Sequence, residues 1–274
     1  MIIGVTGANG HLGRRTVELL LDSAAAPTVV ATTRTPEKAA DLASRGVEVR
    51  HGDFDDPSTL ATAFAGLDKL LIVSADAPDP QLRIGQHAAA IAAAAEAGVP
   101  HVVYTSFVNA DRGRPEFVAV VHTAAEQALR EAGPAWTILR NNLYADALPQ
   151  MVGGPTNAGD GRAGWVARED CAAVAAAVLT APDGEHAGQT YDVTGPQALS
   201  MAEVAAELGS GAPQPVDDEA FVQGMVGTGA PEPMARAFAG FGAAQREGIF
   251  DVVSDVVPRL VGRPAIPVSQ LRAG

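Results

Sequence analysis

Short runs of aliphatic and β-branched residues alternate along this chain with longer stretches in which apolar residues recur at helical spacing. The runs predict strands at residues 2–5, 28–33, 47–50, 70–73, 102–105, 136–139 and 190–193. The longer stretches predict helices at residues 12–20, 36–44, 57–65, 81–97, 117–132 and 169–179. This alternation is typical of βαβ units, whose crossovers are right-handed. We therefore predict an α/β fold, a doubly wound parallel sheet with helices on both faces.

The turn between the first predicted strand and helix has a glycine at every third position. Residues 6–13 read TGANGHLG. Gly7 would permit a tight turn, Gly10 would let a pyrophosphate approach the backbone, and Gly13 would let the helix pack closely on the strand. Phosphates would then lie at the helix N-terminus, near free N–H groups. The turn predicts a dinucleotide site rather than a glycine-rich turn without a ligand. Its other expected contacts are Asn9, His11 and Leu12.

The end of the second predicted strand distinguishes NADP from NAD. An acidic residue at this point would bind the ribose 2′-hydroxyl of NAD, but Arg34 follows the strand instead. A guanidinium suits a 2′-phosphate through paired, charge-assisted hydrogen bonds. The alternative for Arg34 is a solvated loop charge, and Lys38 is expected at the surface. The sequence therefore favours NADP(H) as the cofactor.

Small and polar residues follow the later strands, at the sheet edge where ligands of such folds bind. Asp53 and Phe54 are expected to contact the adenine, although Asp53 could instead cap the helix that begins near Pro57. Ser74 and Ala75 are small enough to leave room for the nicotinamide ribose. Thr105 and Asn141, polar residues at two further strand ends, are also expected to contact the cofactor.

The sequence pattern changes beyond residue 150, where glycine- and proline-rich segments interrupt short helical stretches. No repeat or low-complexity linker marks a clean boundary. We expect residues 1–150 to form an NAD(P)-binding Rossmann domain. Residues 151–274 are expected to form a smaller C-terminal α/β substrate lobe, intertwined with the first domain and closing a pocket over the nicotinamide.

Composition limits the partners. The formal net charge of -13 argues against nucleic acid or an anionic membrane as a ligand, because phosphate binding needs clustered cations. No apolar stretch reaches the roughly 20 residues of a membrane span, and the chain opens without a basic leader segment. We expect a cytoplasmic monomer or homodimer. Cys171, the single cysteine, is expected as a small buried residue rather than a reactive thiol.

The tyrosine–lysine pair of ordinary short-chain dehydrogenases is missing. The residues four positions after the three tyrosines are Val108, Leu148 and Gly195. Reducing a simple ketone leaves a basic alkoxide, which usually needs a positioned general acid. A quinone or cationic dye becomes aromatic or neutral when it accepts hydride, so orientation supplies most of the catalysis. The sequence therefore favours conjugated, electron-poor acceptors.

His122 and Glu126 lie in the predicted helix where that tyrosine and lysine would be found. They are four residues apart and share one helix face. Two interpretations stay open: His122 lies near the nicotinamide and is oriented by Glu126, or the two form an exposed pair. Two ligands without a His-Glu-x-x-His pattern do not predict a metal site.

Several of these segments together resemble the NmrA-like atypical short-chain dehydrogenases. They are residues 6–13, Arg34, and residues 47–54, 70–74, 104–106, 122–126, 139–144, 156–161 and 261–264. The resemblance is nearest to the branch of triphenylmethane-dye reductase and type 2 NAD(P)H:quinone oxidoreductase. It implies NADPH-dependent hydride transfer to a quinone or dye-like aromatic acceptor, with Arg34, Ser74 and Asn141 lining the cofactor. Asn9 and His11 stand where that branch usually has Thr and Gln, and the substrate-facing lobe matches least.

Candidate residues for chemistry come from the same comparison of motifs. The catalytic candidates are His122, Asn141 and Tyr144. The substrate-pocket candidates are Phe107, His122, Asn142 and Tyr144. The main alternative to an enzyme is an NmrA-type redox sensor that binds NADP(H) without turnover, and a third possibility is a reductase or isomerase of secondary metabolism.

Overall fold

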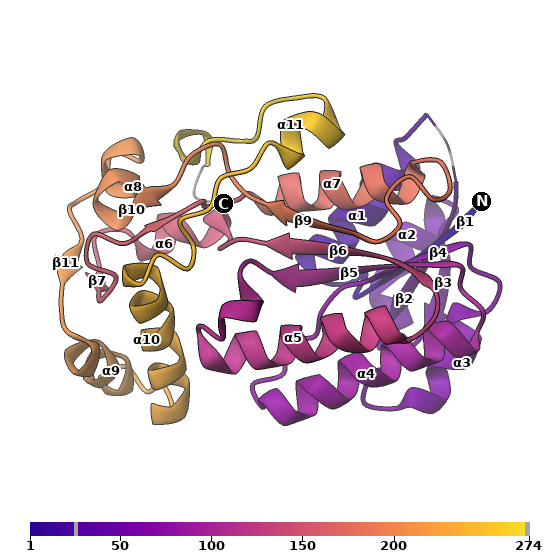
Figure 1. Ribbon diagram of the computed structural model, residues 1–274, viewed down its shortest axis with the longest axis horizontal. Coiled ribbons are helices and arrows are strands. Elements are labelled where there is room, and N and C mark those ends of the chain that lie inside the picture. Colours follow the sequence, from indigo (N-terminus) through magenta and orange to yellow (C-terminus); the bar gives the residue numbers. More distant parts are fainter. Residues whose placement is uncertain (25–26, 272–274) are drawn as a thin grey trace. The chain divides into compact units, whose positions relative to one another are not determined.

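The computed structural model describes residues 1–24 and 27–271, which divide into two compact units (Figure 1). The first unit comprises Met1–Ser106, Val121–Leu139 and Cys171–Tyr191. The second unit comprises Phe107–Val120, Arg140–Asp170 and Asp192–Gly274. Each unit therefore contains residues from both sides of position 150.

A seven-stranded sheet forms the centre of the fold. Its strands are β1 (Ile2–Thr6), β2 (Thr28–Thr33), β3 (Glu48–His51), β4 (Lys69–Ile72), β5 (His101–Phe107), β6 (Ala135–Asn141) and β9 (Gln189–Val193). Their order is β3-β2-β1-β4-β5-β6-β9, and β1 pairs in parallel with both β2 and β4. This order confirms the predicted doubly wound α/β fold. The order reverses direction between β1 and β4, the point at which such sheets bind their ligands.

The predicted helices of this fold are present, and four of them lie within one or two residues of their expected ends, whereas α2 and α3 begin three or four residues later because a 3-10 turn precedes each. They are α1 (His11–Leu21), α2 (Ala40–Ser44), α3 (Leu60–Phe64), α4 (Pro80–Glu96), α5 (Glu116–Glu131) and α7 (Arg168–Thr180). The 3-10 turns η1 (Pro36–Ala39) and η2 (Pro57–Thr59) precede α2 and α3. Proline suits these starts because its fixed φ is helical and it has no N–H to satisfy. In α4, the Asp79 side chain caps the helix by accepting from the Gln81 N–H.

Helices cover both faces of the sheet (Figure 1). One face packs on α3, α4 and α5 through a core of apolar side chains that includes Phe64 and Leu129. Tyr104 of β5 is fully buried in the same core. The helix α1 packs on β1 and β2. Cys171 is buried in α7, which confirms its predicted place in the interior.

The second unit contains short strands and helices. Two-residue strands pair β7 (Pro155–Thr156) with β11 (Gln214–Pro215) and β8 (Arg162–Ala163) with β10 (Leu199–Ser200). Its helices include α6 (Leu148–Met151), α8 (Met201–Glu207), α9 (Asp218–Gly227), α10 (Glu232–Arg246) and α11 (Val256–Val261).

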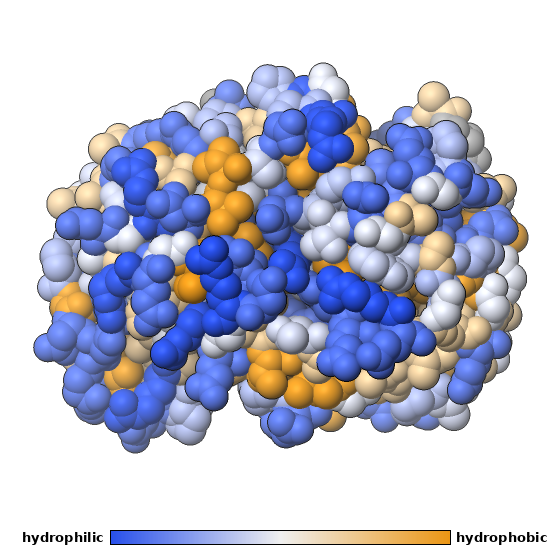
Figure 2. Space-filling model, viewed as in Figure 1, coloured by the Kyte–Doolittle hydropathy of each residue, from blue (hydrophilic) through white to orange (hydrophobic). Residues whose placement is uncertain are grey.

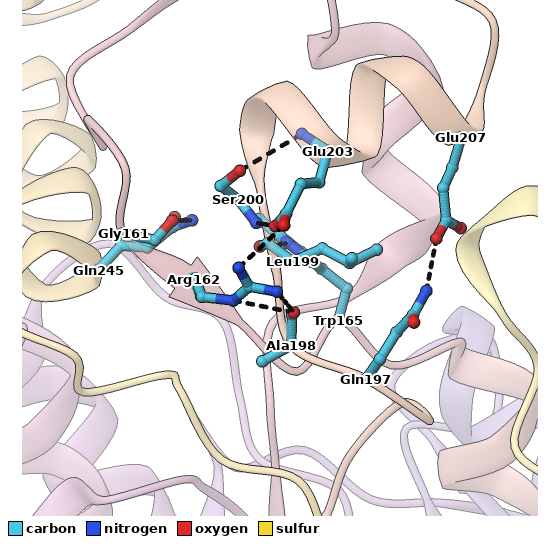
Figure 3. A network of polar contacts seen from close by, with 10 residues as sticks. All are labelled: Gly161, Arg162, Trp165, Gln197, Ala198, Leu199, Ser200, Glu203, Glu207 and Gln245. Atoms are coloured by element: carbon cyan, nitrogen blue, oxygen red, sulfur yellow. Dashed lines mark hydrogen bonds and ion pairs between the residues drawn. The ribbon is translucent and has the colours of Figure 1, made fainter.

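Polar contacts fasten the chain around β8 and α8 in this unit (Figure 3). The Arg162 guanidinium donates to the Ala198 carbonyl at 2.7 Å and pairs with the Glu203 carboxylate at 2.9 Å. Ser200 and Glu203 form a reciprocal capping box that satisfies the first N–H groups of α8. All these groups have partners within the fold, which indicates a structural role.

Hydrophilic residues cover most of the face shown in Figure 2, and hydrophobic residues form only separate patches on it. This surface agrees with the formal net charge of -13. Among the residues that the structure describes, no helix is both long enough and apolar enough to span a bilayer.

Candidate cofactor-binding and active site

The glycine turn has the geometry that its sequence predicts. Gly7 has a φ of +63°, in the left-handed region that favours glycine, and its carbonyl accepts from the Gly10 N–H at 2.8 Å. A Cβ on Gly13 would lie 2.5 Å from the Gly7 oxygen, so α1 could not pack this closely with any other residue. Gly10 caps α1 without a side-chain hydrogen bond. Gly10 therefore offers no side-chain acceptor to the first N–H groups of α1, which suits an anion site at this end of the helix.

Asn9 links this turn to the end of β2. Its Nδ2 donates to the Thr33 hydroxyl at 2.6 Å and to the Thr35 carbonyl at 3.0 Å. Its Oδ1 is buried and has no hydrogen-bond partner within residues 1–24 and 27–271. A buried acceptor without a partner carries a desolvation penalty. A ribose hydroxyl that donates to Oδ1 would remove this penalty, so the turn fits a dinucleotide.

Arg34 lies beside the same turn. Its side chain is 68% exposed, and its guanidinium is 3.8 Å from the Asp55 carboxylate. Asp55 also accepts from the Gln86 side chain at 2.7 Å, which holds the carboxylate in place. Arg34 is accessible to a 2′-phosphate, which would compete with Asp55 for the guanidinium. Lys38, also exposed, lies at the surface as expected.

The loop after β3 holds the candidate adenine contacts. Asp53 accepts from the Asp55 N–H at 3.0 Å, and Phe54 packs against the core. The helix cap ahead of Pro57 is Asp56, which accepts from the Ser58 N–H. The alternative in which Asp53 caps this helix is therefore wrong, because Asp56 directly precedes the proline and lies within reach of the first N–H groups.

Two further predicted contacts lie on α1. His11 is exposed at the first position of the helix, whereas Leu12 is 7% exposed and packs in the core. The side chain of Leu12 is thus part of the fold, and its backbone is the part that remains for a phosphate.

The backbone after β4 is held by side chains from neighbouring elements. Three successive N–H groups donate to them: Val73 to the Thr6 hydroxyl (2.9 Å), Ser74 to the Thr105 hydroxyl (2.9 Å) and Ala75 to Nε2 of His87 (2.8 Å). Such bonds replace the strand ladder where β1 and β4 separate. Ser74 and Ala75 are partly exposed at this point, and the predicted contact Thr105 anchors Ser74.

Two histidines flank a buried tyrosine beneath this segment. The Tyr104 hydroxyl lies 3.1 Å from Nδ1 of His87 and 2.9 Å from Nδ1 of His122. Burial, aided by the nearby Arg83 charge, lowers the pKa of His87 to about 4 and holds the pKa of His122 well below its ordinary value. Burial also raises the pKa of Tyr104. All three side chains are therefore neutral at pH 7.

Sequence reasoning placed His122 in this region but missed His87 and Tyr104. Tyr104 interrupts an aliphatic strand, and His87 lies among alanines of α4. Each of these positions looks like part of a core when it is viewed alone. Only the fold brings the three rings together.

Glu126 is as deeply buried as His122: the exposed fraction is 2% for Glu126 and 4% for His122. The interpretation of these residues as an exposed surface pair is therefore wrong, because this face of α5 packs against the sheet. The Glu126 carboxylate accepts from the Ser106 hydroxyl at 2.6 Å and from Arg130 at 3.0 Å. These bonds satisfy a buried charge that would otherwise be costly.

The remaining candidates lie in the second unit. Asn141 donates to the Tyr144 hydroxyl at 3.1 Å, and its buried Oδ1 has no partner in the described part of the chain. The Arg168 guanidinium lies 4.9 Å from the centre of the Tyr144 ring. Both polar ends of the Asn142 amide bond to backbone, at Phe250 and at Leu143.

Phe107 belongs to an aromatic cluster of the second unit. Its ring packs edge-to-face on Phe250 at 5.6 Å and on Phe241 at 6.2 Å. Asn141 therefore keeps an acceptor for a ligand, whereas the amide of Asn142 is engaged within the fold.

Within the described residues, no group of three or more histidine, cysteine, aspartate or glutamate side chains is arranged to hold a metal ion.

Comparisons with known proteins agree with this geometry. Residues 7–182 match the family model described as NAD(P)H-binding. The chain is 36% identical to NAD(P)H azoreductase of Xenophilus azovorans, across 96% of this chain and 94% of the relative. It is 32% identical to quinone oxidoreductase 2 of Escherichia coli (strain K12), across 98% and 96% respectively.

The solved structure of Citrobacter sp. triphenylmethane reductase complexed with NADP(H) has a TM-score of 0.89 and is 37% identical, covering 99% of this chain and 98% of that chain. These matches confirm the predicted resemblance and the nicotinamide cofactor. The chain belongs to the NAD(P)H-binding family.

Proposed function

We propose that this protein is an oxidoreductase that transfers hydride from NADPH to a quinone or another conjugated, electron-poor acceptor. The observation that carries the proposal is the glycine turn, which leaves helix N–H groups and a buried Asn9 acceptor at the reversal point of the sheet. Its relatives are named as azoreductase and quinone oxidoreductase, and they match nearly the full chain.

Each part of the first unit would hold one part of the cofactor. The N-terminus of α1 would bind the pyrophosphate, and Arg34 would bind the 2′-phosphate. The backbone at Ser74 and Ala75 would border the nicotinamide ribose, and Asp53 would face the adenine. When bound, the cofactor supplies a hydride, and the chain supplies its orientation.

The acceptor class follows from the protonation of the site. His87 and His122 are neutral at pH 7, because burial lowers the pKa of both. Neither side chain is then the strong general acid that a simple ketone needs. A conjugated acceptor delocalises the charge that develops when hydride arrives, so it needs no such acid. For the second unit, we propose that Asn141, Tyr144 and Phe107 contact cofactor or acceptor.

The experiment follows the absorbance of NADPH with purified protein and four acceptor classes: benzoquinones, naphthoquinones, triarylmethane dyes and simple ketones. We expect turnover with the conjugated acceptors only. Tight NADPH binding without any turnover would instead favour a redox sensor. Turnover of simple ketones would contradict the argument from the missing acid.

We also propose that the protein works in the cytoplasm as a monomer or homodimer and binds neither nucleic acid nor membranes. The formal net charge of -13 supports the absence of polyanionic partners. Light scattering of the purified protein tests the oligomeric state.

A further inference from the structure

A chain of hydrogen bonds in the first unit starts at a backbone amide. The Ala75 N–H donates to Nε2 of His87 at 2.8 Å. An amide nitrogen does not accept hydrogen bonds, so Nε2 of His87 carries no proton. The pKa of about 4 keeps this ring neutral at pH 7, and a neutral imidazole carries one ring proton. That proton is therefore on Nδ1.

The remaining directions follow in turn. Nδ1–H of His87 donates to the Tyr104 oxygen at 3.1 Å. The single hydroxyl proton of Tyr104 is then left to donate to Nδ1 of His122 at 2.9 Å. Because burial also keeps His122 neutral, its one ring proton is on Nε2. The reverse assignment would set the Ala75 N–H against a ring N–H, so this arrangement is the one that fits the three hydrogen bonds at 2.8, 3.1 and 2.9 Å.

Burial and the nearby charged groups together keep the three rings neutral. Arg83 of α4 lowers the pKa of both histidines, so it opposes an imidazolium at either position. Burial raises the pKa of Tyr104 and so opposes a tyrosinate; Glu126 of α5 adds to this effect and Arg83 acts against it. Burial lowers the pKa of Arg83 itself, and Tyr104 and Asp76 oppose this lowering.

We infer that His87 and Tyr104 are positioning residues that hold His122 as a neutral imidazole with a fixed Nε2–H donor. The consequence for catalysis rests on the proposed function: His122 stabilises the reduced acceptor as a hydrogen-bond donor and does not transfer a proton. This series of hydrogen bonds cannot deliver a proton, because it ends at the Ala75 amide, whose N–H does not ionise near pH 7. The hydride reduces the acceptor by two electrons, and the proton that completes the product comes from water.

The same chain reaches the proposed cofactor site at its other end. Ala75 is held by His87, and the neighbouring Ser74 by Thr105. A change in the orientation of His87 would thus disturb both the backbone at the nicotinamide ribose and the donor at His122. His87 couples two parts of the site that the sequence places on separate elements.

Nitrogen-15 NMR of the histidine rings tests the assignment directly, with the full chain free of cofactor. The protein has six histidines, so individual signals are resolvable. Between pH 6 and 8, we expect the Nδ1–H form for His87 and the Nε2–H form for His122. The opposite tautomer at either ring, or an imidazolium at His122, would overturn the inference without any variant.

Two tyrosine variants supply a matched comparison. Tyr104→Phe removes the donor to His122, so the His122 signals should shift toward a mixture of tautomers. Tyr191→Phe removes the same hydroxyl from another buried pair, in which His186 Nδ1 lies 2.9 Å from the Tyr191 oxygen. This control should leave the signals of His87 and His122 unchanged. Equal spectral changes at His122 in both variants would indicate a general structural effect and would count against the inference.

Steady-state kinetics with a quinone then test the catalytic consequence. Tyr104→Phe should lower kcat by about 3- to 10-fold, the effect of one neutral hydrogen bond, with little change in the KM for NADPH. Tyr191→Phe should keep the wild-type kcat. An unchanged kcat in Tyr104→Phe would overturn the catalytic role. If wild-type protein reduces no acceptor but shows the expected tautomers, the proposed function fails and the tautomer assignment is supported.

Discussion

Arg34→Ala should weaken the binding of NADPH far more than the binding of NADH. NADH has a hydroxyl where NADPH has the 2′-phosphate, so only NADPH loses a charge-assisted hydrogen bond. Such a bond contributes about 1.5–3 kcal/mol when it is sheltered from water. The Arg34 side chain is 68% exposed, so solvent screening favours the lower value, about 1.5 kcal/mol. This value corresponds to an about tenfold higher Kd for NADPH.

Isothermal titration of the cofactor-free protein with each nucleotide measures this difference. Lys38→Ala is the matched control, because it removes an exposed cation in η1. We expect it to change either affinity by less than about twofold. Asp55→Asn should strengthen NADPH binding, since the Asp55 carboxylate lies 3.8 Å from the guanidinium and repels a phosphate. Equal losses of NADPH and NADH affinity in Arg34→Ala would refute the role of Arg34 in binding the 2′-phosphate.

Three further predictions concern stability and the glycine turn. Gly13→Ala should lower the free energy of unfolding by about 1–3 kcal/mol in urea titrations, because its Cβ would lie 2.5 Å from the Gly7 oxygen. Gly85→Ala, whose Cβ would meet no atom within 4 Å in a helix, should instead raise it by about 0.5–1 kcal/mol; a loss at Gly85 would contradict the steric argument. Asn9→Ala should weaken NADPH and NADH about equally, by roughly 3- to 10-fold, and selective loss of one would argue against a ribose contact. Burial lowers the pKa of His87 from 6.5 to about 4, so its contribution to the free energy of unfolding is fully present above pH 6.5 and falls as the pH drops toward 4. Between pH 7 and 5, we expect this side chain to lower the free energy of unfolding by about 2 kcal/mol. An unfolding midpoint that does not change with pH would refute this prediction.

The sheet could be predicted from the sequence because each strand carries its own signal. Aliphatic runs such as β4 are buried on both faces and differ sharply from the helices between them. The sequence predicted one helix where the structure has a 3-10 turn followed by α2 or α3. Pro36 and Pro57 are suited to the start of a 3-10 turn and of an α-helix alike, so they do not distinguish the two. Two-residue strands such as β7 and β8 carry no periodicity, so no pattern could have located them.

The cofactor turn could be predicted because its residues are close together in the sequence. The hydrogen-bonded histidines could not be predicted because their residues are far apart in the sequence. Gly7, Gly10 and Gly13 are local, and their spacing alone specifies a backbone shape. His87 and His122 lie 17 and 18 residues from Tyr104, on separate elements. Their contact depends on two crossovers and on the packing of α4 and α5 against β5. Sequence spacing contains no information about such a contact until the order of the strands is known.

The buried histidines connect stability with chemistry. Keeping His87 and His122 neutral requires burial, and that burial destabilises the folded protein in acid, because the unfolded chain binds the protons that the folded one excludes. Hydrophobic side chains in the same places would avoid this penalty and fill the same core. The hydrogen bonds with Ala75 and Tyr104 satisfy both ring nitrogens of His87 and Nδ1 of His122, but they do not remove the sensitivity of the fold to acid. In return for this acid sensitivity, the inferred arrangement gives His122 an uncharged Nε2–H donor with a fixed direction. Such a donor suits a conjugated hydride acceptor, which needs to be oriented more than it needs a proton.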